Sequence, residues 1–236
     1  MPIHDWSRFS DGTFHAFHLN WMSQLQGALK RLLPKGYYAL AEQDLIGLGP
    51  DVLTLQKRDA PPLPAAGGKA TMAPPRTAFE FRMGRASYTA AQRRLVIRHK
   101  SGRRVVAIIE LVSAGNKSSQ HKFDKFLENV GGVLSQGVHA LVIDLQASTP
   151  RDPRGVHAAL WESLGGEEFV PPADRPLTLA SYEGEPALAA HVEPVAAGMA
   201  LPDMPLYLGP DYYVLVPLER TYAAAFDLMP EPEDLE

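Results

Sequence analysis

The segment from Arg104 to Val112 constrains the fold of this chain more than any other, because it is apolar on both faces of a strand. Successive side chains of a strand point to opposite faces of the sheet. The apolar residues of the segment occupy both sets of positions: Val105, Ala107, Ile109 and Leu111 alternate with Val106, Ile108 and Val112. Such a strand is typical of the interior of a sheet that is covered on both sides.

Glu110 interrupts this apolar segment. Burying an unpaired carboxylate costs several kcal/mol or forces the group to take up a proton. The strand therefore predicts a compensating group: a metal ion, an open cleft, or a basic partner such as Arg94, Arg98 or Lys117. The residues that follow the strand include Ser, Gly, Asn and Lys, which is typical of the rim of a site.

The composition narrows the class of protein. The 236 residues are 45% hydrophobic, which is enough for one core or for one core with a small appendage. The 23 basic and 27 acidic residues exclude an overall basic surface, so any contact with nucleic acid has to be local. There is no cysteine, no apolar segment of the kind found in secretory signals after Met1, and no apolar run long enough to span a membrane. The expectation is a cytoplasmic protein.

The first part of the chain predicts a helix followed by strands. Apolar residues recur at three- and four-residue spacing from Thr13, which we take as the N-cap, until Pro34 and Gly36 stop the helix. Residues 37–48 and 51–56 then predict two strands of a hairpin.

The middle of the chain predicts a flexible excursion and then a βαβ unit. Residues 57–78 are rich in proline and glycine, which is typical of a flexible surface loop. Residues 94–100 and 104–112 predict a hairpin closed by Ser101-Gly102. An amphipathic helix over 119–135 and an apolar strand over 138–145 follow, so the strand pair should be parallel with a right-handed crossover.

After Pro150 the composition changes to short strand-like pieces separated by prolines. Three of these pieces predict strands, at 177–182, 190–195 and 212–218. The chain is therefore expected to divide into residues 1–149, the α/β core, and residues 150–236. This C-terminal β-rich part is either a small subdomain or an extension of the main sheet, and periodicity does not decide between them.

The order of these elements resembles the PD-(D/E)XK nuclease superfamily. The residues that carry the resemblance are Pro50-Asp51 at a strand start and Glu110 in the apolar strand. The segment from Glu110 to Lys117 is also similar to the Uma-type branch of that superfamily. The resemblance implies an α/β, restriction-endonuclease-like mixed sheet with an αβββαβ core flanked by helices, followed here by the C-terminal β-rich extension.

The chain also resembles, over most of its length, the bacterial domain-of-unknown-function family 4058. That family supplies no activity that could be carried over. The matching pieces are residues 14–18, 37–42, Pro50-Asp51, Glu110 to Lys117, 138–145 and 201–205.

The nuclease resemblance implies a Mg²⁺ site. Asp51 and Glu110 would supply carboxylate ligands from neighbouring strands, with Glu42 as a third ligand. The metal would activate a water, and a lysine would orient it. The lysine of the motif should stand two residues after Glu110, where this chain has Val112. Lys117, or Lys122 on the helix that follows, would have to act in its place.

Two functions follow from this pattern. The first is Mg²⁺-dependent hydrolysis of nucleic-acid phosphodiesters, with Asp51, Glu110 and Lys117 as catalytic residues. The second is a non-catalytic binding or assembly scaffold that keeps the fold without the motif lysine. The basic cluster from Arg93 to Arg104 is the best candidate for a phosphate-facing surface. Assembly into a homo-oligomer stays open.

Overall fold

The structure is a computed structural model that describes residues 1–44, 56–57, 79–80, 92–100, 105–184, 188–209 and 212–230. The chain forms two compact units, residues 1–44 with 93–236 and residues 45–92. In the second unit the strands β2 (Gln56–Lys57) and β3 (Phe79–Glu80) pair antiparallel. Four sequence predictions fall wholly or partly outside the described residues. These are residues 51–55 of the strand predicted at 51–56, Asp51 itself, residues 58–78 of the excursion predicted at 57–78, and the turn at Ser101-Gly102.

The first unit is built on a six-stranded mixed sheet with the order β1-β4-β5-β6-β7-β8. Its strands are β1 (Tyr37–Asp44), β4 (Gln92–His99), β5 (Val105–Leu111), β6 (His139–Asp144), β7 (Leu177–Glu183) and β8 (Ala189–Val195). β5 lies in the interior of this sheet, and its residues from Ala107 to Leu111 are all buried. The prediction of a strand covered on both faces is therefore confirmed.

The predicted βαβ unit is confirmed as well. β4 pairs antiparallel with β5, and β5 pairs parallel with β6, with Ile109 opposite Leu141. Helix α2 (Gln120–Leu134) connects the two parallel strands. It begins after Ser119, whose hydroxyl accepts a hydrogen bond from the Lys122 backbone N–H, and Gly137 follows its end with a φ of 75°.

One side of α2 carries the apolar stripe that the sequence predicts. Its fully buried members recur at helical spacing: Phe123, Phe126, Val130 and Leu134. Burying four side chains of this size stabilises the fold by roughly 6–12 kcal/mol relative to leaving them exposed. This stripe holds α2 against the sheet.

The N-terminal helix α1 (Asp11–Leu32) starts earlier than the sequence predicted. Ser10, and not Thr13, is the N-cap, because the Ser10 hydroxyl accepts a hydrogen bond of 3.1 Å from the Thr13 backbone N–H. Asp11 in the first turn adds a favourable charge at the positive end of the helix dipole. The apolar spacing predicted the helix, but it did not distinguish between two hydroxyl residues three positions apart.

The C-terminal third adds two strands to the main sheet and forms a separate two-stranded sheet beside it. β7 pairs antiparallel with β6, and β8 pairs antiparallel with β7. The hairpin of β9 (Met204–Gly209) and β10 (Tyr212–Val216) packs against the sheet, since β9 contacts β5, β6 and β7. The short helix α3 (Gly155–Ser163) precedes β7, and α4 (Leu218–Phe226) follows β10 and packs on α1.

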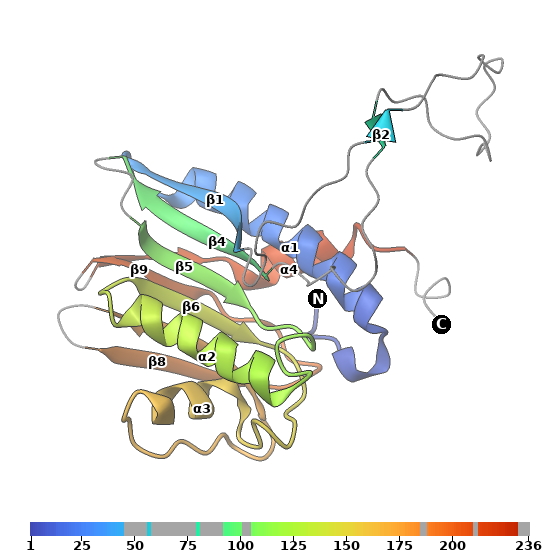
Figure 1. Cartoon of the computed structure of the whole chain (residues 1–236), viewed down its shortest axis with the longest axis vertical. Coiled ribbons are helices and arrows are strands. Elements are labelled where there is room, and N and C mark those ends of the chain that lie inside the picture. The colour runs from blue at the N-terminus through green and yellow to red at the C-terminus, as the bar shows by residue number, and fades with distance from the viewer. Residues whose placement is uncertain are drawn as a thin grey trace. The chain divides into compact units, whose positions relative to one another are not determined.

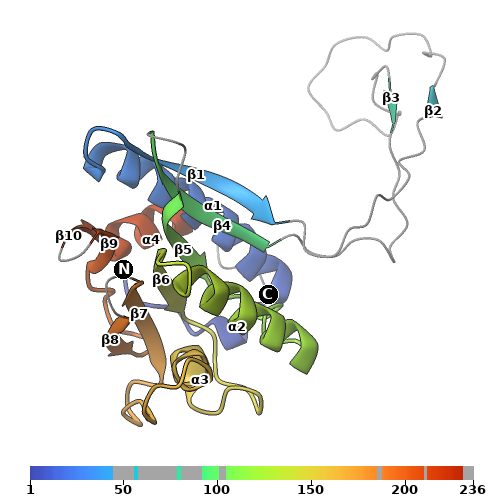
Figure 2. The same cartoon turned by 60° about the vertical axis from the view of Figure 1, so that its left-hand side comes forward.

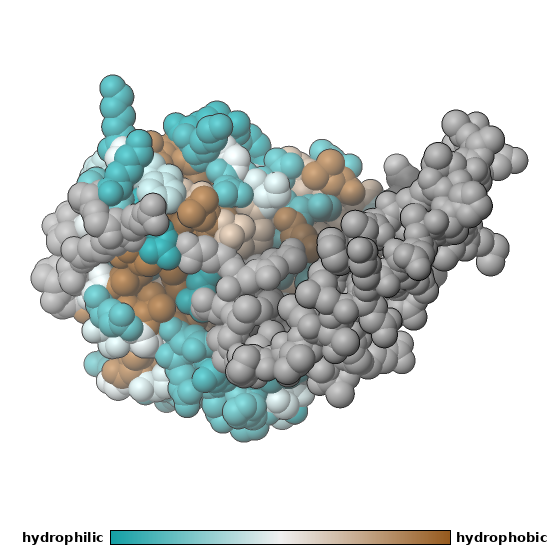
Figure 3. Space-filling model, turned by 45° about the horizontal axis from the view of Figure 1, so that its top comes forward, coloured by the Kyte–Doolittle hydropathy of each residue, from teal (hydrophilic) through white to brown (hydrophobic). Residues whose placement is uncertain are grey.

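These elements form layers around the sheet. Figures 1 and 2 show α2 and α3 on one face, with α1 and α4 on the other. One buried cluster joins the sheet to α1, α4 and β9, while a second joins it to α2 and α3. On the face that Figure 3 displays, apolar residues reach the surface between hydrophilic ones, as they do on most proteins.

The neighbour of β1 in the sheet is β4. Residues 51–55, which belong to the strand predicted to form a hairpin with 37–48, lie outside the described residues, so that hairpin stays a prediction. The Lys100 backbone N–H donates to the Gly36 carbonyl over 2.8 Å, so the start of β1 meets the end of β4. Gly36 has a φ of 101°, and a Cβ there would lie 2.9 Å from His99 Nε2. This turn therefore requires glycine.

None of the helices in the described part of the chain is long and apolar enough to cross a membrane.

Candidate functional site

Glu110 lies on the face of β5 that α2 covers, next to Ile108 and Val112 of the same buried cluster. It is only 4% exposed. Arg94 of β4 supplies the compensating charge, with its Nε 3.1 Å from Glu110 Oε1. The two residues continue the β4–β5 register by one position beyond the Leu95–Ile109 pair. Of the compensating groups that the sequence left open, the structure shows the ion pair with Arg94.

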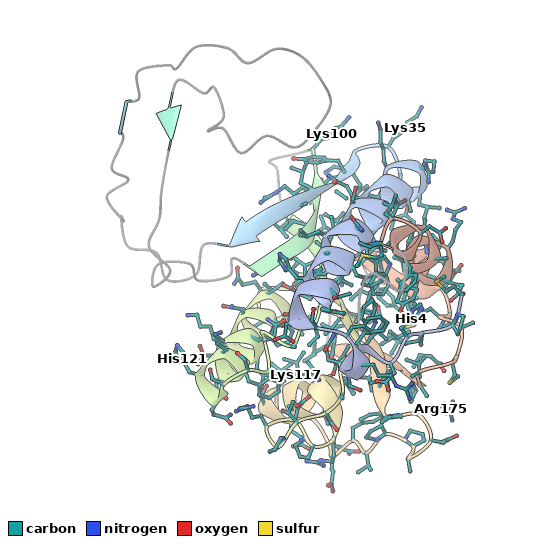
Figure 4. All side chains as sticks on the ribbon, turned by 90° about the vertical axis from the view of Figure 1, so that its right-hand side faces the viewer. His4, Lys35, Lys100, Lys117, His121 and Arg175 are labelled. Atoms are coloured by element: carbon teal, nitrogen blue, oxygen red, sulfur yellow. The ribbon has the colours of Figure 1, made fainter. Side chains whose placement is uncertain are left out.

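Lys117 is also buried, at 2% exposure, in the turn that follows β5. Its Nζ lies 3.0 Å from Asp144 Oδ2 and 2.6 Å from Asp152 Oδ2. The same ammonium group donates to the backbone carbonyls of Gln146 and Ala147 over 3.2 and 3.4 Å. Figure 4 shows Lys117 between α2 and α3. Lys117 is thus the centre of a buried cluster with two carboxylates, which we call the Lys117 triad.

Three segments of the chain position this triad. Asp144 ends β6, Lys117 lies in the turn after β5, and Asp152 lies in the loop before α3. Asp152 holds its own loop, because its Oδ1 accepts hydrogen bonds from the Thr149 backbone N–H and hydroxyl. Arg151 then donates to the Lys117 carbonyl over 2.8 Å. The triad therefore joins the loops at the C-terminal ends of the two parallel strands.

Asp144 is the most strongly constrained member of the triad. Burial raises the pKa of its carboxyl, and the Lys117 ammonium opposes this rise only in part. Asp152 adds a smaller upward contribution to the same pKa. The Val156 backbone N–H, at the start of α3, donates to Asp144 Oδ2 over 3.2 Å. The Asp152 carboxylate therefore acts in the same direction as burial on the pKa of Asp144.

The turn after β5 is built by Asn116. Its side-chain oxygen accepts hydrogen bonds of 2.8 Å from both the backbone N–H and the hydroxyl of Ser113. This closes the Ser-Ala-Gly-Asn-Lys segment and directs Lys117 inward. The residues that suggested the rim of an open site therefore form a closed structural turn.

The structure does not bring Glu110 and Lys117 to one another: each has partners of opposite charge elsewhere. Lys122, the other candidate lysine, is exposed on the first turn of α2. The side chains of Asp51 and Glu42 lie outside the described residues. Among the residues that are described, no group of three or more His, Asp or Glu side chains could hold a metal ion.

Sequence reasoning missed the two acidic partners of Lys117. Asp144 carried the same signal as Glu110, because it is a carboxylate at the end of an entirely buried strand, Val-Ile-Asp. Asp152 carried a weaker signal, a Thr-Pro-Arg-Asp-Pro turn. Its partner is 35 positions away in the sequence, and spacing alone does not show such a contact.

A second buried polar contact lies beneath α3. His157 Nδ1 is 2.6 Å from the hydroxyl of Tyr182, which is on β7. Burial lowers the pKa of His157 to about 4, so the imidazole is neutral at pH 7. Burial also raises the pKa of the Tyr182 hydroxyl well above its usual range. The pair can exchange a hydrogen bond but carries no charge, which suits a structural contact.

Comparisons of the chain with models of known protein families, with curated proteins and with solved structures find no match.

Proposed function

We propose that this chain is a non-catalytic binding or assembly module that uses a nuclease-like α/β fold. The observation that carries the proposal is the state of the two groups on which cleavage would depend. The Glu110 carboxylate and the Lys117 ammonium are both buried in ion pairs with other residues of the chain. Neither is presented to a substrate.

The order of the elements supports the nuclease-like fold within this proposal. A helix precedes β1, β4 and β5, then α2 leads to β6, and β5 and β6 are parallel. This is the arrangement that the resemblance to the PD-(D/E)XK superfamily implies. The resemblance to the bacterial family 4058 agrees with it, since the matching pieces include Glu110 to Lys117 and β6.

The energetics favour a structural role for Glu110. Mg²⁺ keeps several waters when proteins bind it, so a ligand has to face solvent or a wet cleft. Glu110 is 4% exposed, and removing a charge from a buried pair typically costs about 3–5 kcal/mol. Recruiting Glu110 to a metal would leave Arg94 buried without this partner.

Metal-dependent phosphodiester hydrolysis is the second candidate. Glu110 and Asp144 favour it, because both carboxylates lie on the α2 face near the C-terminal ends of adjacent parallel strands. Ligands commonly bind at such ends in α/β sheets. In this candidate Glu110 would leave Arg94 and join Asp51 around Mg²⁺.

A cleavage assay with matched variants separates the two candidates. Purified wild-type protein is incubated with single- and double-stranded DNA and RNA in Mg²⁺ or Mn²⁺, beside Glu110→Gln and Asp51→Asn. Glu128→Gln, which changes an exposed carboxylate on α2, is the matched control. We expect no cleavage by any of the four proteins.

Cleavage by the wild type and Glu128→Gln that is lost in Glu110→Gln and Asp51→Asn would overturn the proposal. Asp51→Asn keeps the test decisive if Glu110→Gln does not fold. Thermal melts with and without Mn²⁺ provide a second readout. A stabilisation by Mn²⁺ that both variants abolish would establish the metal site even without cleavage.

A further inference from the structure

The charges of this chain are unevenly distributed along its sequence. Residues 1–110 contain 16 Lys or Arg and 8 Asp or Glu, whereas residues 111–236 contain 7 and 19. The formal net charge of −4 is therefore the sum of +8 on residues 1–110 and −12 on residues 111–236, which we call the first and second parts. Two segments of the first part have no acidic residue at all: residues 12–41 with three basic residues and residues 92–109 with six.

The fold brings basic residues of both segments to one end of the sheet. Lys30 and Arg31 are in the last turn of α1, and Lys35 is in the turn that leads to β1. Lys100 follows β4, and its backbone N–H bonds to the Gly36 carbonyl, so Lys100 and Lys35 belong to adjacent strand ends. Figure 4 shows the Lys35 and Lys100 side chains at the same end. We call these four residues the cationic end.

All four side chains of the cationic end belong to exposed residues. Within the part of the chain that the structure describes, none of them forms an ion pair with a carboxylate. The acidic residues of β1, Glu42 and Asp44, are at the far end of the strand. Because a strand rises about 3.3 Å per residue, these two acidic residues lie roughly 20 Å from the start of β1 and the cationic end. This distance exceeds the Debye length of about 8 Å in physiological salt.

A structural role accounts for only part of this cluster. Lys30 and Arg31 are favourable near the negative end of the α1 dipole. That argument does not extend to Lys35 and Lys100, which lie beyond the helix and add two further like charges. Like charges on neighbouring surfaces repel one another unless an anion binds them.

We propose that the cationic end binds the phosphate backbone of a nucleic acid. This names the partner of the proposed binding module, but it rests on residues that take no part in the Glu110 pair or the Lys117 triad. Four long, exposed cations from three segments suit a ligand that presents evenly spaced charges over an extended surface. Among residues 29–35 and 97–100, Leu32 is the one large apolar residue that is exposed, at 40%, and a single such residue is a weak membrane anchor.

The acidic second part of the chain influences which surface of the protein would face a nucleic acid. Its charge of −12 repels the same phosphates, so the cationic end is favoured over the acidic surfaces of the second part. A nucleic acid bound there would meet α1 and the start of β1 rather than α3 or β8. Binding would depend steeply on salt and only weakly on base sequence, because backbone contacts carry no sequence information.

Fluorescence anisotropy with labelled duplex DNA, single-stranded DNA and single-stranded RNA, titrated with the full-length protein, tests this. Each phosphate contact contributes about −0.9 to the slope of log K against log salt on duplex DNA. Four contacts therefore predict a slope near −3.6, or roughly 100-fold weaker binding at about 200 mM than at about 50 mM salt. Lys35→Gln with Lys100→Gln should reduce the magnitude of the slope by about 2.

Lys122→Gln with Lys125→Gln is the matched control, since it removes the same charge from α2. We expect the control to bind like the wild type. Equal loss in both double variants, or no binding to any nucleic acid, would overturn the proposal. Two parallel probes are vesicles that contain phosphatidylserine and, separately, a poly-glutamate peptide. Binding to the vesicles that is tighter than binding to nucleic acid would assign the cationic end to a membrane instead. Tighter binding to the peptide would assign it to an acidic protein.

The two proposals fail separately. Cleavage that depends on Glu110 would overturn the non-catalytic module and leave the cationic end untouched. Absence of salt-dependent binding would remove the nucleic-acid partner and leave the buried ion pairs as they are.

Discussion

Lys117→Met tests the Lys117 triad most directly. The variant keeps an unbranched side chain of similar length and removes the ammonium that lies 3.0 Å from Asp144 and 2.6 Å from Asp152. Both carboxylates are almost fully buried, and the carbonyls of Gln146 and Ala147 also lose their donor. Removing one partner of a buried ion pair costs about 3–5 kcal/mol. At this chain length about 1 kcal/mol shifts the melting temperature by about 2–4 °C, so a fall of roughly 6–20 °C at pH 7 is expected.

The loss should depend on pH in a defined direction. Burial already raises the pKa of Asp144 above its usual value of 3.8, and without Lys117 that pKa rises further. A carboxyl whose pKa is raised on folding favours the folded state below its unfolded pKa, and this contribution is lost as pH rises through the folded value. The variant should therefore lose less stability relative to the wild type as the pH falls from about 7 toward 4.

Urea unfolding of both proteins across this pH range provides the measurement. Lys122→Met, an exposed lysine on α2, is the control and should change stability by no more than about 0.5 kcal/mol. A second variant, Lys117→Met with Asp144→Asn, should recover part of the loss at pH 7 because one buried charge is gone. A loss below about 1 kcal/mol, or one that is the same at every pH, would refute the reasoning about the triad.

Three further predictions follow from contacts elsewhere in the fold. Burial lowers the pKa of His157 from 6.5 to about 4, so its contribution to stability is complete above pH 6.5 and is lost as the pH falls toward 4. The loss should amount to about 3 kcal/mol. Urea unfolding of His157→Gln across this pH range should lack this component. Thr221→Val removes the hydroxyl oxygen that lies 3.0 Å from the Trp21 indole nitrogen and accepts its hydrogen bond, so it should cost about 1–3 kcal/mol. Thr13→Val, at a half-buried position near the start of α1, should cost less in thermal melts of both variants. Glu110→Leu should cost about 3–5 kcal/mol, and adding Arg94→Met should recover most of it; non-recovery in a double-mutant cycle would contradict the pairing of these two side chains.

The sequence predicted the central part of the fold because hydrophobic periodicity specifies which faces are buried. The two-faced apolar strand at β5, the stripe of α2 and the apolar β6 determine a βαβ unit together, and all three are confirmed. The N-cap of α1 was placed at Thr13 instead of Ser10, because both residues carry a hydroxyl that can cap a helix and only the backbone geometry distinguishes them. The place of β7 and β8 in the main sheet was not predictable from periodicity, which does not encode strand order.

For the candidate site, the sequence predicted that the buried charge of Glu110 needs a compensating group, but not which group that is. The apolar surroundings of Glu110 required a partner, and Arg94 was among the groups considered. Lys117 was assigned to catalysis because it follows the motif strand, yet its inward direction is set by Asn116 and by Asp144 and Asp152. Long side chains reach partners distant in sequence, so spacing alone does not predict which carboxylate a lysine meets.

The adjacency of β1 and β4 has a consequence for the origin and engineering of this chain. β1 ends at Asp44 and β4 begins at Gln92. The two strands are neighbours, and the start of β1 lies beside the end of β4, so Asp44 and Gln92 both lie at the opposite end of this strand pair. The unit of residues 45–92 is therefore an insertion between β1 and β4, two strands that would otherwise form an ordinary hairpin. A short Gly-rich turn could take its place without changing any strand order. Since Asp51 belongs to the inserted unit, a single deletion would separate whatever that residue does from the fold that carries Glu110.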